Sequence, residues 1–333
     1  MLTTTRKTVR PLAALGVAAL ALTTAACGSS SGGDTAAGPK PLSRLEITAP
    51  AAPGGGWDST ARAAQGVLQS EKLASSVQVV NVPGAGGTVG LAKLANAKGE
   101  PTLMTMGLVM VGAIETNKSE TTLDDVTPIA RLTSEQEAIV VPSSSPYTTL
   151  EDFVAAWKKD PGAFPIAGGS AGGTDQILAG LLAQEAGIDP KAVNYIAYSG
   201  GGEALAAILG GKVAAGISGV SEFTDQVAAG DMRALAVSGN EPVEGFDAPT
   251  ITDAGFDVEL TNWRGIVAPA GLSEQDEQAL TDVVQKMHDS AAWKTAMDTN
   301  GWDDAFLPAD EFAAFLTEEK TRVSDVLTSL GLV

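Results

Sequence analysis

The groups best suited to do chemistry in this chain are backbone amides in a glycine-rich loop. An apolar run from Pro165 ends in Gly168-Gly169-Ser170-Ala171-Gly172-Gly173, and Thr174 then opens a segment whose apolar residues have helical spacing. Glycines let a ligand approach the main chain, and the first turn of a helix presents unbonded N–H groups and a partial positive charge. This combination suits an anion, either a phosphate or a carboxylate. The alternative is that Thr174 only caps the helix and the glycines only form the turn.

Three further loops repeat this pattern. Each joins a segment with strand character to a segment with helical spacing, at 53–60, 84–88 and 199–203. The carboxyl ends of parallel strands meet at one edge of a sheet, and ligands of open α/β folds bind there. We therefore expect the four loops to surround one binding site.

The glycine-rich loop at 168–173 also fits a catalytic motif. Residues 168–172 satisfy G-x-S-x-G, the nucleophile elbow of serine hydrolases, with Ser170 as the nucleophile. Such an enzyme needs a histidine after the serine, and the chain has one histidine, His288. His288 lies in an amphipathic helical segment, whereas the histidine of that fold normally lies on a loop. We interpret His288 as a helix-surface residue, and a secreted serine hydrolase using Ser170 and His288 stays as the alternative.

No cofactor or metal site is predicted. The loop at 84–90 lacks the third glycine of a dinucleotide fingerprint because Val89 stands there, and Gly211-Lys212 lacks the upstream glycine of a P-loop. One histidine and one cysteine argue against a transition-metal site, and the carboxylates do not follow the calcium-loop pattern. The net charge of −19 argues against nucleic acid as a partner, so an anionic ligand must be held by local donors.

The first residues predict export. A basic stretch precedes a short apolar segment at 11–22, which is too short to span a membrane. Small residues then precede Cys27, as in a bacterial lipobox, so residues 1–26 are expected to be a lipoprotein signal peptide and Cys27 the lipidated anchor on the outer face of the cell membrane. An ordinary signal peptide with an incidental cysteine is the alternative. Residues 27–42 are rich in glycine and serine and are expected to form a flexible tether.

Strand and helix patterns alternate in two units along the rest of the chain. The predicted strands lie at 45–50, 77–83, 102–107 and 137–142 in the first unit and near 164–168, 193–198, 213–218 and 232–237 in the second. Pro142 and the segment 240–262 interrupt the alternation, and three helices end the chain. We expect a discontinuous lobe 1 (43–141 plus 262–333) and a lobe 2 (142–261), joined by two crossings that act as a hinge.

Two residues and one short segment have two interpretations each. Asp58 follows the glycines at 54–56 and could cap the first helix while also lining the cleft. Trp57 could stack on a ligand or cover the hinge. Residues 108–110 follow a predicted strand and could face either the cleft or the core.

Taken together, the chain resembles the substrate-binding proteins of the tripartite tricarboxylate transporter family, also called the Bug family of solute receptors. The resemblance covers nearly all of residues 45–333 and rests on the order and spacing of several segments rather than on one motif. These segments are 48–58 with 60–62, 82–88, 169–180, 198–213 and 263–271.

The resemblance implies an α/β, two-lobed type II periplasmic-binding-protein (Venus flytrap) fold, each lobe a mostly parallel sheet flanked by helices. It implies that a small carboxylate lies between first-lobe glycine loops and a second-lobe helix N-terminus. The residues carried over are Gly54, Gly55, Gly56, Asp58, Gly86, Gly87, Thr88, Ser170, Gly173, Thr174, Gly201 and Gly202. Two departures reduce the polar groups near the cleft: Ile177 replaces a histidine, and 107–109 replace a serine-rich segment, of many relatives.

The expected function is therefore that of a lipid-anchored extracytoplasmic receptor. It would capture a small organic di- or tricarboxylate by lobe closure and deliver it to the membrane permease subunits of a tripartite tricarboxylate-type transporter. We expect no catalysis and no cofactor, and a monomer is the default for a receptor that must open and close.

Overall fold

The computed structural model describes residues 42–97, 101–198 and 201–333. These residues belong to one compact unit, Pro41–Val333. The predicted signal peptide and Cys27 lie outside the described residues, as does the predicted tether apart from Leu42, which forms a parallel bridge with Ala74.

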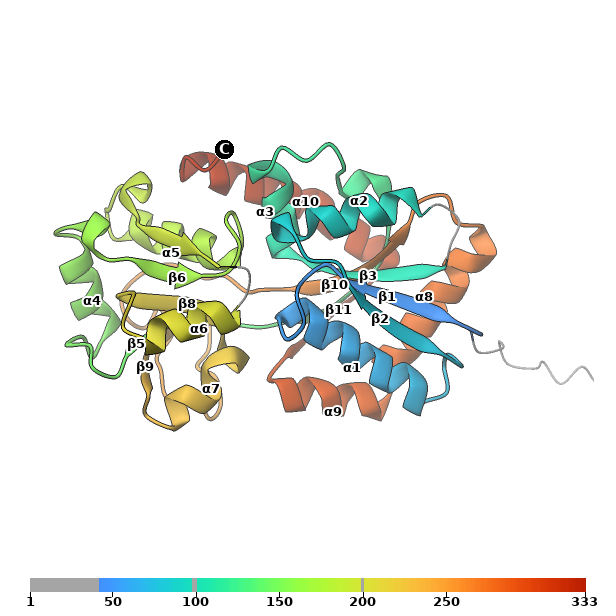
Figure 1. Ribbon diagram of the computed structural model, residues 1–333, viewed down its shortest axis with the longest axis horizontal. Helices are drawn as coiled ribbons and strands as arrows, with labels where there is room; N and C mark the ends of the chain where they lie inside the picture. Colours follow the sequence, from blue (N-terminus) through green and yellow to red (C-terminus); the bar gives the residue numbers. More distant parts are fainter. Residues whose placement is uncertain (1–41, 98–100, 199–200) are drawn as a thin grey trace, which may run out of the picture. The chain divides into compact units, whose positions relative to one another are not determined.

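A six-stranded mixed sheet forms the centre of the first lobe (Figure 1). Its strands are β1 (Leu45–Ala49), β2 (Val77–Asn81), β3 (Thr102–Gly107), β4 (Val126–Ser134), β10 (Arg264–Pro269) and β11 (Asp303–Pro308). Their order is β11-β4-β10-β3-β1-β2. β1 pairs in parallel with β2 and β3, while β10 runs antiparallel to β3 and β4, and β11 antiparallel to β4. β1 to β4 therefore point in one direction, but three of the five neighbouring pairs are antiparallel, so the sheet is mixed rather than mostly parallel.

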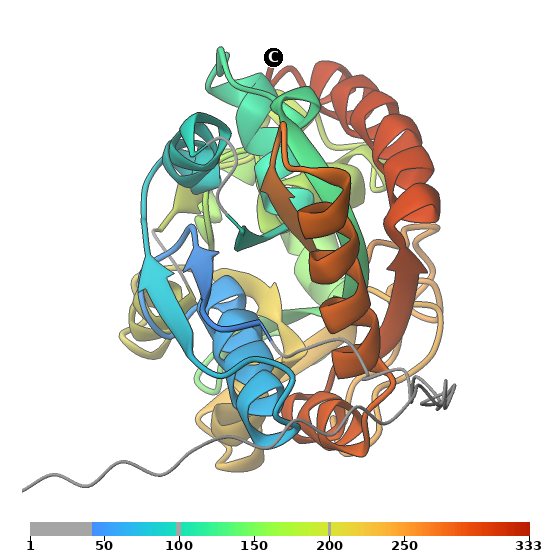
Figure 2. The same cartoon turned by 90° about the vertical axis from the view of Figure 1, so that its right-hand side faces the viewer.

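Helices cover both faces of this sheet (Figures 1 and 2). They are α1 (Gly56–Ser70), α2 (Thr88–Asn96), α3 (Leu108–Thr116), α8 (Glu274–His288), α9 (Ala291–Asn300) and α10 (Ala309–Ser329). Alternate residues of a strand point to opposite faces. Leu103 of β3 packs in a cluster with side chains of α1, α8 and α9, whereas Met104 and Met106 pack with α2, α3 and α10.

A five-stranded mixed sheet forms the centre of the second lobe. Its strands are β5 (Glu137–Pro142), β6 (Ile166–Gly168), β7 (Tyr195–Ala197), β8 (Ala215–Gly219) and β9 (Met232–Val237), in the order β7-β6-β8-β5-β9. β6 pairs in parallel with β7 and β8, and β5 runs antiparallel to β8 and β9. The helices are α4 (Leu150–Trp157), α5 (Thr174–Glu185), α6 (Gly201–Leu209) and α7 (Val220–Ala228). Side chains of α6 and α7 pack on one face and those of α4 and α5 on the other.

Short 3-10 helices connect several of these elements. They are η1 (Ala85–Gly87), η2 (Leu123–Asp125), η3 (Pro161–Ala163) and η4 (Pro190–Ala192).

The first crossing between the sheets lies before β5 and not at Pro142, where the sequence placed it. The segment 137–142 was expected to end lobe 1, but as β5 it pairs with β8 and β9 of the second sheet. β4, β10 and β11 of the first sheet were not predicted. Alternation of apolar residues shows that a segment forms a strand, but the choice of sheet depends on pairing with distant strands.

The two crossings lie side by side and are hydrogen-bonded to each other. The amide of Glu135 donates to the carbonyl of Asn262 at 3.1 Å, and the amide of Asn262 donates to the carbonyl of Glu135 at 2.8 Å. Gln136 and Thr261 form an antiparallel bridge between the same segments. The second crossing therefore lies beside the first, at Thr261 and Asn262.

Candidate ligand-binding site

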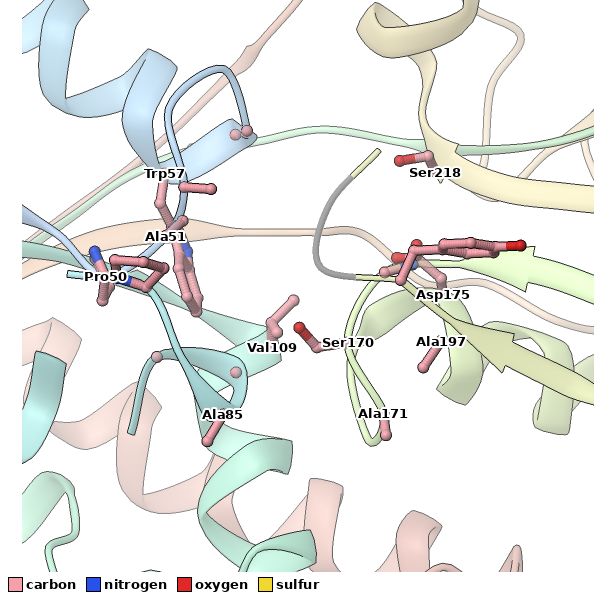
Figure 3. A pocket seen from close by; sticks show the side chains of 18 of the residues that line it. Pro50, Ala51, Trp57, Ala85, Val109, Ser170, Ala171, Asp175, Ala197 and Ser218 are labelled. Atoms are coloured by element: carbon pink, nitrogen blue, oxygen red, sulfur yellow. The ribbon is translucent and has the colours of Figure 1, made fainter. Parts of the chain in front are cut away.

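A cavity of about 580 Å³ lies between residues of the two lobes. All four predicted glycine loops contribute to its lining, through residues 55–57, 84–87, 169–171 and Glu203. Figure 3 shows Trp57, Ala85 and Val109 of the first lobe opposite Ser170 and Ser218 of the second. The expectation that the loops lie together is confirmed, because each follows the carboxyl end of a strand in its own lobe.

The loop before α1 lines the cavity and contains amides without a hydrogen-bond partner among the described residues. Gly55 is the N-cap residue of α1 and no side chain caps this helix. Within the described residues, the amides of Gly55 and Gly56 donate no hydrogen bond, and both residues line the cavity. The loop therefore offers the donors and the helix dipole that an anion requires.

Asp58 fastens this loop instead of lining the cavity. Its Oδ2 accepts hydrogen bonds from the amide of Gly54 at 2.9 Å and from Nε of Arg62 at 2.8 Å, while its Oδ1 accepts from Nδ2 of Asn81 at 2.8 Å. Burial raises the pKa of Asp58, but the bonds from Arg62, Gly54 and Asn81 and the charge of Arg62 outweigh it and hold the pKa below its usual value. Asp58 is thus an ionised support of the loop.

Glycines shape the other glycine loop of the first lobe, at residues 84–88. Gly86 and Gly87 have positive φ angles of 59° and 91°. A Cβ on Gly87 would lie 2.7 Å from the ring of Trp57 and 2.8 Å from Cε of Met110. The hydroxyl of Thr88 donates to the carbonyl of Ala85 at 3.0 Å, so it stabilises the turn and leaves the cavity to the main chain.

The second-lobe loop is held by side chains from two elements. Oδ2 of Asp175 accepts from the amide of Gly169 at 2.6 Å, and the hydroxyl of Tyr195 donates to the carbonyl of Gly169 at 2.8 Å. Ser170 and Ala171 line the cavity, and their amides donate no hydrogen bond within the described residues. Each lobe therefore contributes a glycine loop that an aspartate at the start of the following helix holds in place.

The predicted site residues divide into two groups. Gly55, Gly56, Gly86, Gly87 and Ser170 line the cavity. Six others are not among the residues that line it: Gly54, Asp58, Thr88, Gly173, Thr174 and Gly202.

Thr174 is fully buried, and its hydroxyl has no partner among the described residues, so its predicted direct contact with a ligand is not supported by its position. Gly201 begins α6 directly after residues 199–200, which lie outside the described residues. Of the positions with two interpretations, Trp57 and Val109 line the cavity, and Leu108 and Met110 belong to the core.

Sequence reasoning missed the charged residues of the cavity. Arg264, Asp175, Glu203 and Glu222 line it, together with the polar residues Asn117, Tyr198, Ser218 and Asn262. The guanidinium of Arg264 pairs with Glu135 of the first crossing, Nη2 to Oε2 at 2.7 Å, and the side chain is 5% exposed. A Cβ on Gly56 would collide with this guanidinium, which explains the glycine at the start of α1. The sequence did contain a signal for this residue, because Arg264 is the one charged residue of the otherwise apolar segment 263–269.

The carboxyl groups on the second-lobe side have raised pKa values. Burial, helped by the negative charges of Asp175 and Glu135, raises the pKa of Glu222 to about 7. Burial also raises the pKa of Asp175 to about 6 against the lowering effect of its backbone hydrogen bonds. Glu137 of β5 is fully buried, and within the described chain neither of its oxygens has a partner, so burial and the neighbouring acids raise its pKa well above the usual value.

The sequence profile of the tripartite tricarboxylate transporter family receptors matches residues 60–332. The chain belongs to this receptor family. The receptor is 26% identical over 302 residues to protein BugT of Bordetella pertussis, and the aligned region covers 87% of this chain and 90% of BugT.

Two solved structures share the fold of this receptor. MatC of Rhodopseudomonas palustris with bound malate is 24% identical with a TM-score of 0.76, and the match covers 86% of this chain and 99% of MatC. Rpa4515 of R. palustris with adipate is 19% identical with a TM-score of 0.78, and the match covers 87% of this chain and 98% of Rpa4515. The two-lobed fold implied by the sequence resemblance is confirmed.

The receptor is not an enzyme, because its homologues and structural neighbours are solute-binding receptors. The geometry of His288 agrees. Its Nε2 lies 3.1 Å from Oδ1 of Asp304 and its ring stacks on Phe306 at 3.9 Å, in the first lobe. His288 is not among the residues that line the cavity with Ser170, so the serine-hydrolase alternative is wrong. None of the helices in the described ranges has both the length and the apolar character of a membrane span.

Proposed function

We propose that this receptor captures a small organic carboxylate in the cavity between its lobes and delivers it to the permease subunits of a tripartite tricarboxylate-type transporter. The observation that carries the proposal is that loops of both lobes line one cavity with residues whose amides have no partner among the described residues, Gly55 and Gly56 on one side and Ser170 and Ala171 on the other. Such donors recognise carboxylate oxygens without a bound cofactor. A ligand held by both sides favours the closed arrangement of the lobes.

The solved relatives support a carboxylate ligand. MatC holds malate and Rpa4515 holds adipate, and both have the fold described above. The proposed ligand contacts are Gly55, Gly56, Gly86, Gly87 and Ser170, with Arg264 as a charged donor. Asp58, through its bond from the amide of Gly54, and Thr88 would hold the first-lobe loops in place.

The proposal includes an exported, lipid-anchored monomer. Cys27 would carry the lipid after removal of residues 1–26, and residues 27–42 would let the lobes reach the permease. Replacing Cys27→Ala should release the protein from the membrane fraction into the medium while thermal unfolding of the lobes stays unchanged. Retention of this variant at the membrane would contradict the lipid anchor.

Thermal unfolding against a panel of mono-, di- and tricarboxylates tests the binding proposal. A carboxylate at 100 times its dissociation constant should stabilise the native state by about 2.7 kcal/mol. The variant Ala171→Trp, which fills the cavity, should lose this shift. Ala228→Trp on the exposed end of α7 is the matched control and should keep it. If no member of the panel stabilises the wild type, the proposed ligand class is wrong.

A further inference from the structure

Helix α10 connects the two lobes a third time, away from the two chain crossings. Its first half packs on the first lobe, where the ring of Trp263, directly after the second crossing, makes edge contacts with the rings of Phe312 and Phe315 at 5.8 and 5.2 Å. Nε1 of Trp263 also donates to Oε1 of Glu319 at 2.9 Å. From Glu319 the helix runs for about 16 Å to Leu330, which packs against the second lobe (Figure 1). α10 is therefore carried by the first lobe and ends on the second.

At this contact, each lobe packs a side chain on a glycine of the other. Leu330 is 2% exposed, and a Cβ on Gly180 of α5 would lie 2.5 Å from Cδ1 of Leu330. In the opposite direction, the stem of Lys191 in η4 fills the space beside Gly331, where a Cβ would collide with it. The two surfaces are therefore complementary, and their close approach depends on the absence of a side chain at both glycines.

The turn after α10 gives the contact a defined shape. Gly331 has a positive φ of 68°. The amide of Leu332 donates to the carbonyl of Leu327 at 2.9 Å, and the amide of Gly331 donates to the carbonyl of Thr328 at 3.0 Å. These two bonds are the pair that ends a helix at a left-handed glycine. The turn is thus fixed to α10 and moves with the first lobe.

The other half of the contact is fixed to the second lobe. Helix α5 packs against β6, β7 and β8, and Nζ of Lys158 in α4 donates to the carbonyl of Ala186 at its end, at 2.9 Å. Leu330 and Gly180 therefore belong to different lobes. Any change in the angle between the lobes about the two crossings must move these two residues relative to each other.

A second cavity, of about 270 Å³, lies beside the contact. It is lined by Gln176, Gly180, Pro190, Lys191 and Val193 of the second lobe and by residues 330–332. The permanent core of a protein has few voids larger than a water molecule. A void of this size is what two surfaces leave when they meet without merging into one core. The contact can therefore separate while the core of each lobe stays intact.

We propose that Leu330 and Gly331 form a latch, which closes on Gly180 and Lys191 and holds the lobes together even without a ligand. None of these four residues lines the cavity between the lobes, so the latch acts without touching the ligand. The apparent affinity of a ligand is its affinity for the closed arrangement multiplied by the closed fraction. The latch therefore raises the affinity for every ligand by the same factor. This inference goes beyond the proposed function, because it concerns lobe closure and not the ligand.

Small-angle X-ray scattering of the ligand-free receptor tests the latch. Leu330→Ala removes the side chain that packs on Gly180, and Gly180→Val forces that side chain away. We expect both variants to have a larger radius of gyration than the wild type. The double variant should be no more open than Leu330→Ala alone, because the collision is gone. Gly66→Val on α1, where a Cβ meets no atom within 4 Å, is the matched control and should keep the wild-type radius.

Calorimetric titration of the same variants with malate, adipate and citrate gives the second measurement. Each ligand that binds the wild type should bind Leu330→Ala and Gly180→Val more weakly, by a common factor of about threefold or more. Circular dichroism confirms that each variant is folded. An unchanged radius of gyration in both variants, with or without a loss of stability, would show that the contact is only structural packing and would overturn the latch. A larger radius with unchanged affinity would also overturn it. If no carboxylate binds the wild type, the proposed function fails, while the scattering still decides the latch.

Discussion

Arg264 and Glu135 form an ion pair, Nη2 to Oε2 at 2.7 Å, that joins the two chain crossings between the lobes. Glu135 lies in the first crossing, and Arg264 begins β10 directly after the second. Glu135 also accepts hydrogen bonds from Ser221 at the start of α7 in the second lobe. The pair therefore connects the hinge, the second lobe and the floor of the cavity in one contact.

Removing the cation of this pair should destabilise the receptor strongly. Arg264→Leu leaves the carboxylate of Glu135, which is 1% exposed, without its positive partner. We expect the free energy of unfolding in urea to fall by about 3 kcal/mol or more at neutral pH. Lys320→Met, which breaks the surface pair of Lys320 with Asp124, is the control and should cost about 1 kcal/mol or less. Equal losses in the two variants would contradict a buried hinge pair.

Stability of the ligand-free receptor should increase as the pH falls from about 7 to about 5. The raised pKa values of Glu222, about 7, and Asp175, about 6, mean that the folded state binds more protons than the unfolded chain in this window. Their contribution is present when they are protonated and is lost as the pH rises through the folded pKa values. Asp58 has the opposite effect, because its pKa is lowered in the folded state. Its ionised form stabilises the fold at neutral pH, and this contribution is lost only as the pH falls below the ordinary pKa of 3.8.

Urea unfolding at several pH values, with Glu222→Gln beside the wild type, measures this effect. The variant should show a smaller change between pH 7 and pH 5 because one of the titrating groups is gone. If the free energy of unfolding of the wild type instead falls between pH 7 and pH 5, the pKa values of these carboxyl groups are not raised.

Gly56→Ala should abolish ligand binding, whereas Gly66→Ala on the same helix should not. A methyl group on Gly56 collides with the guanidinium of Arg264 and displaces a donor of the cavity. Gly66 lies on the exposed side of α1, where a Cβ meets no atom within 4 Å. Gly66→Ala should instead stabilise the helix by about 0.5 to 1 kcal/mol. If the affinity of Gly56→Ala is unchanged, the loop before α1 is not part of the ligand-binding site.

Asp58→Ala should weaken both the fold and ligand binding, although Asp58 does not line the cavity. The change leaves the amide of Gly54 and the side chains of Arg62 and Asn81 without their acceptor. We expect a loss of about 2 kcal/mol in the free energy of unfolding and a lower affinity, because the loop is no longer fixed. Asp298→Ala, at an exposed position of α9, should change neither quantity. Normal affinity in a folded Asp58→Ala variant would mean that the loop needs no support.

Local features of the chain could be predicted because their causes lie close together in sequence. The glycine loops and the helices that follow them depend on backbone freedom and on the spacing of apolar residues within about one helix length. The start of α5 at Thr174 and the four loops around one cavity were predicted in this way. The family resemblance depends on the order of the same local segments.

The tertiary structure decided what depends on residues distant in sequence. Strand β5 was assigned to the wrong lobe because the sheet that it joins depends on pairing with β8 and β9. The pair of Arg264 with Glu135, 129 residues apart, holds in place the one cationic side chain among the described residues that line the cavity. The sequence by itself determined the donors at the helix starts. Only the folded chain gathered the buried acids and Arg264 around them, because burial and electrostatic proximity exist only once the two crossings and the lobes have assembled.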